Sequence, residues 1–75
     1  MKAYILINVR PGHITEVIKL VRSLDVVVEA HMTFGPYDGI IKVEAEDLKQ
    51  MGKLIAEDIQ PIPGILETLT CIAPD

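Results

Sequence analysis

The sequence is poor in cysteine and in cations and has no long apolar run, and each shortage excludes a class of function. The single cysteine, Cys71, cannot form a disulfide within the chain. Seven Lys and Arg against eleven Asp and Glu give a net charge of -4, and the scattered cations argue against direct binding of nucleic acid. Neither a leader peptide nor a membrane-spanning stretch is apparent, so we expect a cytoplasmic protein without a membrane partner.

Residue types that carry catalysis or bind metals are equally sparse. His13 and His31 are far apart in the sequence and have no second cysteine or carboxylate cluster at metal-ligand spacing, so we expect no metal and no cofactor. Cys71 lies in an apolar segment without a base near it in sequence, which favours an inert thiol. The acidic residues Glu44, Glu46 and Asp47 lie at the junction of a strand and a helix, where helix capping and the helix dipole explain an acid. The sequence therefore predicts no catalytic residues.

Apolar residues, in contrast, make up 49% of a chain of only 75 residues, and the mean hydropathy is +0.34. A domain of this size buries a smaller fraction of its surface than a larger domain does, so its own core cannot hide so much apolar area. We therefore expect one domain over residues 1–75, with part of its apolar surface covered by a partner.

The spacing of apolar residues predicts four strands and two helices. Continuous or alternating apolar positions place strands over residues 3–9, 26–34, 40–45 and 65–73, the first buried on both faces and the second at an edge. Spacings of three and four place amphipathic helices over residues 13–24 and 47–59. The second helix begins with a capping box formed by Asp47 and Gln50, and it ends before Pro61.

This order of elements is the ferredoxin-like βαββαβ pattern, an α+β fold. Right-handed crossovers place both helices on one face of a four-stranded antiparallel sheet, which leaves the other face bare. Period-two alternation assigns Tyr4, Leu6 and Ile40 to the bare face. Such an apolar patch predicts a two-fold homodimer, a dimeric α/β sandwich in which two sheets pack together.

The turn between the second and third strands, Gly35-Pro36-Tyr37-Asp38-Gly39, is the most distinctive segment. Asp38 could hold an ammonium group and turn N–H groups could hold a carboxylate, so the turn suits an amino acid. A plain turn in which Asp38 caps local backbone groups explains the same residues. As turn residues, all of them are expected to be exposed. Thr68 and Thr70 could add hydroxyl groups, but threonine is also an ordinary strand residue.

Three segments in this order resemble one family: Gly35-Pro36-Tyr37-Asp38, Ala45-Glu46-Asp47-Leu48, and Ile62-Pro63-Gly64-Ile65 leading to Thr68-Leu69-Thr70. From Ala3 to Ile72 the chain is similar to the effector-binding (RAM) domain of Lrp/AsnC-type transcription regulators. The resemblance implies the same ferredoxin-like fold, dimerisation through the sheets, and larger assemblies of dimers with amino acids bound between them. It also implies an effector site that contains Gly35, Pro36, Tyr37 and Asp38, completed by Thr68 and Thr70 of a neighbouring subunit.

Members of that family usually carry an N-terminal helix-turn-helix, whereas this chain begins with the first strand, so the resemblance implies a stand-alone effector domain. Such a domain could modulate full-length Lrp/AsnC-type regulators by forming mixed assemblies with them. We expect a neutral aliphatic amino acid as effector, because residues 33–41 contain no Arg or Lys to pair with an acidic side chain. A basic effector is the alternative, since Asp38 or a nearby glutamate could pair with its second cation.

Two other functions compete with this interpretation. The first is a small dimeric ferredoxin-like enzyme such as a cofactor-free oxygenase, in which Glu29 and His31 would supply the polar groups of an enclosed cavity. The second is a purely structural oligomeriser, which would bind no small molecule.

Overall fold

The computed structural model describes residues 1–74, and it confirms the ferredoxin-like βαββαβ order of elements. The four strands are β1 (Lys2–Val9), β2 (Val27–Met32), β3 (Gly39–Glu44) and β4 (Ile65–Ala73). The helices are α1 (Ile14–Arg22) and α2 (Leu48–Leu54), and α2 continues into the π-helical turn η1 (Ile55–Ile59). In this part of the chain, no helix has the length and hydrophobicity needed to cross a bilayer.

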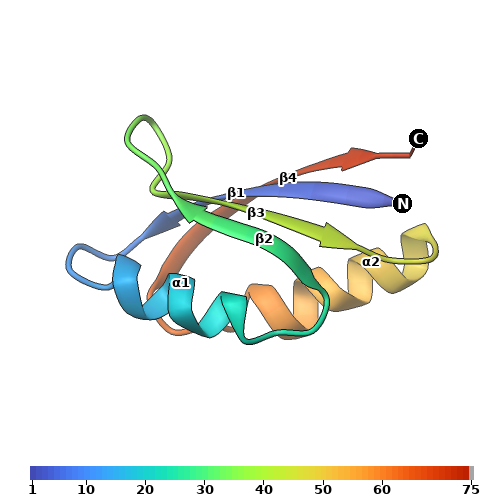
Figure 1. The fold of residues 1–75 in the computed structure, drawn as a ribbon, viewed down its shortest axis with the longest axis horizontal. Helices are drawn as coiled ribbons and strands as arrows, with labels where there is room; N and C mark the ends of the chain where they lie inside the picture. Colours follow the sequence, from blue (N-terminus) through green and yellow to red (C-terminus); the bar gives the residue numbers. More distant parts are fainter. Residues whose placement is uncertain (75) are drawn as a thin grey trace.

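The strands form one antiparallel sheet in the order β2-β3-β1-β4, and both helices lie on the same face of it (Figure 1). The prediction that β2 is an edge strand is therefore confirmed. The prediction that β1 is buried on both faces is wrong for the single chain, because Tyr4 on the face away from the helices is 37% exposed. A central strand of a two-layer fold has only one covered face.

The core lies between the sheet and the helices and is made of aliphatic side chains and one methionine. Its largest fully buried members are Ile5, Ile7, Ile41, Met51, Ile59, Val17, Val21 and Val43. Burying a side chain of this kind contributes about 1.5–3 kcal/mol of stability. Among the described residues no polar or charged side chain is buried, so apolar packing is the main contact between the two layers.

The start of α2 confirms the predicted capping box. The Asp47 carboxylate accepts a hydrogen bond from the Gln50 N–H at 2.8 Å, and the Gln50 side-chain oxygen accepts one from the Glu46 N–H at 2.6 Å. The other end differs from a regular α-helix, since Gln60 N–H donates to the carbonyl oxygen of Ile55, five residues back. This wider turn places Ile55 and Ile59 together in the core.

The second strand is shorter than the predicted 26–34 and does not alternate regularly. Its pairing with β3 shifts between Val27 and Glu29, which makes Val28 the extra residue of a bulge, and the Val28 side chain is 50% exposed. Phe34, which the predicted range included, lies beyond the end of β2 and is 94% exposed. A bulge inverts the alternation on one side of it, and period-two patterns alone do not reveal that.

Candidate functional site

The tip of the β2–β3 hairpin is joined to the end of β1 through Asp38. The Asp38 carboxylate oxygen Oδ2 accepts a hydrogen bond from the Val9 N–H at 2.7 Å. The Asp38 N–H donates to the Ile7 carbonyl at 2.9 Å, and its own carbonyl accepts from Thr33 N–H at 2.9 Å. Asp38 and Tyr37 are half-buried and Gly39 is buried, so the expectation that all turn residues are exposed is wrong at these three positions.

The rest of the tip is a loop whose two ends are joined by a hydrogen bond. The Thr33 hydroxyl donates to the Tyr37 carbonyl oxygen at 2.8 Å, which fixes both ends of the segment between them. Gly35 and Pro36 at its apex are exposed, and the loop stands clear of the sheet in Figure 1. The backbone at the apex of the tip is therefore exposed, while the residues at its base are held by hydrogen bonds. Because the base is already ordered, less conformational entropy is lost when a ligand binds.

The structure brings the two threonines to the helix side of β4 but not into the hairpin tip. Thr68 is opposite Ile7, and Ile7 is opposite Gly39 at the start of β3, so these residues form one row across three strands. Neighbouring strands lie about 4.8 Å apart, which places the Thr68 and Gly39 backbones about 10 Å from each other. Thr70 lies two residues further along β4, opposite Ile5. One copy of the chain therefore holds Thr68 at the same end of the sheet as the tip, and Thr70 farther away.

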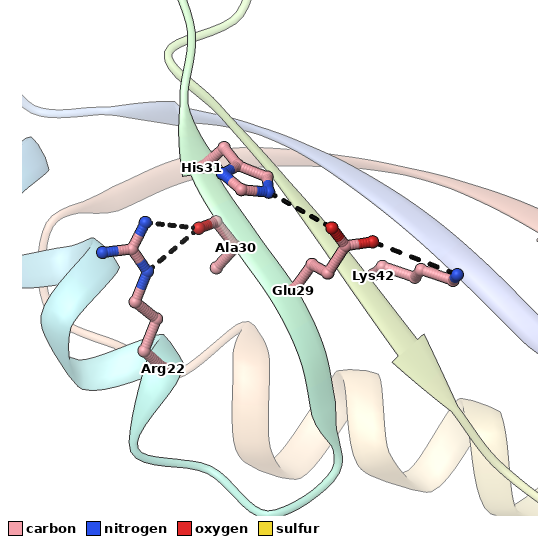
Figure 2. Close-up of polar contacts among 5 residues, drawn as sticks. All are labelled: Arg22, Glu29, Ala30, His31 and Lys42. Carbon is pink, nitrogen blue, oxygen red and sulfur yellow. Dashed lines mark hydrogen bonds and ion pairs between the residues drawn. The ribbon is translucent and has the colours of Figure 1, made fainter.

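A group of polar and charged side chains, Glu29, His31 and Lys42, lies on the sheet face away from the helices and was not singled out as a unit from the sequence. Glu29 lies 3.5 Å from the His31 ring nitrogen Nε2 and 4.0 Å from the Lys42 ammonium (Figure 2). The Lys42 nitrogen is also 6.0 Å from the centre of the Tyr4 ring. If the bulge in β2 had been known, period-two alternation would have placed these residues on one face of the sheet.

This group of polar and charged side chains has the properties of a solvated surface and not of an enclosed active site. The side chains of His31 and Glu29 are 59% and 55% exposed, and exposed ion pairs contribute little. The hollow beside them holds about 70 Å³, far below the size of a small-molecule site. Across residues 1–74, no three His, Cys, Asp or Glu side chains gather in a way that could hold a metal ion. The arrangement gives the oxygenase interpretation no support.

The same sheet face becomes apolar toward β1 and β4. Leu6 lies between Ile40 and Leu69 in the register, and Tyr4 lies opposite Cys71. Leu69 is 47% exposed and Tyr4 37% exposed, although both are large apolar side chains. The prediction that Tyr4, Leu6 and Ile40 share the face without helices is confirmed.

Comparisons with known proteins agree with this architecture. The family model described as the Lrp/AsnC ligand binding domain matches residues 2–74. The HTH-type transcriptional regulator FL11 of Pyrococcus horikoshii is 31% identical over 72 residues, which are 96% of this chain and 47% of the regulator. The chain thus spans less than half the length of that curated relative.

Solved structures show the same fold. The crystal structure of FFRP-DM1 has 38% sequence identity and a TM-score of 0.92, and the match covers 96% of each chain. The complex of the regulator NMB0573 from Neisseria meningitidis with L-Met has a TM-score of 0.83 at 15% identity, and the match covers 93% of this chain and 47% of that one. The second likeness extends to the fold alone.

Proposed function

Because this chain belongs to the Lrp/AsnC ligand-binding domain family, we propose that it is an effector-sensing domain, comprising residues 1–75, which binds a free amino acid and assembles through its sheet. The observation that supports this most is the family match, which covers residues 2–74 and concerns a ligand-binding domain specifically. The curated relatives are transcription regulators, which points away from an enzyme.

In this proposal the amino acid binds at the hairpin tip, at Gly35, Pro36, Tyr37 and Asp38. Exposed N–H groups of the turn would donate to its carboxylate, and the Asp38 oxygen Oδ1 would accept from its ammonium group while Oδ2 keeps the bond to Val9. The L-Met complex of NMB0573 supports an amino acid as the ligand class. The absence of Arg and Lys from residues 33–41 favours a neutral aliphatic one.

The partner in this proposal is a second copy of the chain. The apolar half of the face without helices, around Leu6 and Leu69, would pack against its two-fold equivalent. Larger assemblies would then bring Thr68 and Thr70 of a neighbouring subunit to the hairpin tip and complete the pocket. Full-length Lrp/AsnC-type regulators, which contain the same domain, are the further partners that we propose.

A thermal-shift screen with the twenty standard amino acids tests the effector proposal, followed by calorimetry on the ligands that raise Tm. A ligand that binds only the folded state stabilises it by mass action, so a neutral aliphatic amino acid should raise Tm. Asp38→Asn can retain an acceptor for the Val9 N–H but removes the charge, and should weaken binding about tenfold.

The matched control is Asp25→Asn, which removes an exposed carboxylate just before β2, at the end of that strand away from the tip. It should leave the affinity unchanged. If no amino acid raises Tm, the chain is a structural oligomeriser and not a sensor. Equal affinities for the Asp38→Asn and Asp25→Asn proteins would remove Asp38 from the site.

A further inference from the structure

A groove between α1 and the edge strand β2 is not used by the proposed effector site. It is an open groove of about 410 Å³, lined by Ile14, Thr15, Ile18, Lys19 and Arg22 of α1 and by Met32 of β2. Sites for small molecules commonly hold about 300–1,000 Å³, so the groove has room for a ligand of a few carbon atoms.

The floor of the groove is aliphatic. Ile18 is almost fully buried beneath it, Ile14 is half-buried, and Met32 leaves half of its side chain in water. A branched aliphatic group in the groove would remove these carbon atoms from water, and that transfer is favourable. The flexible methionine side chain can adjust to the shape of such a group.

The charges in the groove are all positive. Lys19 and Arg22 are its only ionisable lining residues, although the whole chain has a net charge of -4. Both lie on α1, one turn apart, above the aliphatic floor. The groove therefore complements an anion that also carries an aliphatic group.

Arg22 is held in place by the strand beside it. Its Nε and Nη2 atoms donate to the Ala30 carbonyl oxygen at 3.0 and 2.7 Å (Figure 2). A guanidinium group has five N–H donors, and Figure 2 shows the remaining terminal nitrogen directed away from Ala30. A guanidinium fixed in this way can donate to a carboxylate with little further loss of side-chain freedom.

We propose that the groove between α1 and β2 is a second ligand site, which takes a small aliphatic carboxylate without an amino group, such as a branched 2-oxo acid. The carboxylate would lie at Arg22 and Lys19, and the branched end on Ile14, Ile18 and Met32. An amino acid suits this groove less, because its ammonium group would meet two cations and no carboxylate. The proposal does not depend on the effector site at the hairpin tip.

The test compares 4-methyl-2-oxopentanoate with L-leucine, which share a carbon skeleton and differ in the oxo and amino groups. Methyl NMR signals of Ile14, Ile18 and Met32 in the full chain report on the groove itself. We expect these signals to move in a saturable way with the oxo acid, and a Kd at least about tenfold higher for leucine at the same signals. Unmoved signals at millimolar oxo acid, or equal binding of leucine, would overturn the proposal.

Charge variants then test the cationic rim. Lys19→Gln leaves the hydrogen bonds of Arg22 to Ala30 in place, so it should not affect folding, and it should raise the Kd for the oxo acid several-fold. Arg22→Gln should raise it about tenfold, as expected for the loss of a charge-assisted hydrogen bond. The control is Lys49→Gln on α2, which changes the net charge by the same amount and should leave Kd unchanged. If Lys49→Gln weakens binding as much as Lys19→Gln, the effect is general electrostatics and the site is rejected.

Discussion

The Asp38 carboxylate takes the place of a backbone carbonyl as the hydrogen-bond acceptor for Val9, whose amide nitrogen lies 2.7 Å from Asp38 Oδ2. Regular pairing of β1 with β3 ends at Ile7 and Gly39, so the Val9 N–H has no backbone acceptor on that side. The Tyr37 carbonyl, near in the chain, accepts a hydrogen bond from the Thr33 hydroxyl and not from Val9. Asp38 therefore contributes to the fold of the hairpin tip as well as to the proposed ligand site.

Replacing Asp38 by alanine should lower the free energy of unfolding by about 1–3 kcal/mol, because the partly buried Val9 N–H loses its acceptor. Asp38→Asn, which retains a side-chain oxygen, should lose less than half of that amount. Urea denaturation of the two variants measures the difference. Asp25→Ala, at an exposed carboxylate, should stay within about 0.5 kcal/mol of the unchanged protein. An equal loss for Asp38→Ala and Asp25→Ala would show that the bond to Val9 contributes nothing.

Gly64→Ala should destabilise the fold, since Gly64 has a φ of +100° and a side chain there would meet Val17 at 3.1 Å. Backbone strain of this kind costs on the order of 1–3 kcal/mol for a residue with a β-carbon. Gly52→Ala is the matched control, because that glycine lies within α2 with open space around it. It should stabilise the protein by up to about 1 kcal/mol. Thermal unfolding of both variants should therefore shift Tm in opposite directions.

If the face without helices is the proposed dimer interface, Leu6→Lys should shift the protein toward monomer. A lysine at that position would place an unpaired ammonium group in an apolar contact, which is strongly disfavoured. Sedimentation should find the unchanged protein at a multiple of 8.3 kDa and the variant nearer to 8.3 kDa. Leu48→Lys, at an exposed position on α2, should leave the distribution unchanged. A folded monomer of the unchanged chain at micromolar concentration would contradict the interface.

The chain by itself should not bind duplex DNA, because its eleven acidic residues outnumber seven basic ones and would repel the phosphates. A gel-shift assay at low salt is the most sensitive check, since electrostatic binding is strongest there. Retardation that disappears as salt is added would contradict this prediction.

The order of strands and helices, the start of α2 and the apolar residues of the bare sheet face could be predicted from the sequence alone. These features depend on residues close together in the chain. The Asp47 and Gln50 capping box involves a span of three residues, and Tyr4, Leu6 and Ile40 follow from alternation within single strands. The family resemblance, carried by the order of three short segments, was likewise readable from local sequence, and the match over residues 2–74 confirms it.

The way in which separate elements share their polar groups follows from the tertiary structure and not from local sequence. The partner of the Asp38 carboxylate is 29 residues away, and the Ala30 carbonyl that fixes Arg22 belongs to another element. The bulge at Val28 arises from pairing with β3, and the groove beneath Lys19 exists because β2 lies beside α1. Local periodicity predicts the face of the strand or helix on which a side chain lies. Hydrogen-bond partners and grooves depend on the distances between elements, and those distances are known only from the folded chain.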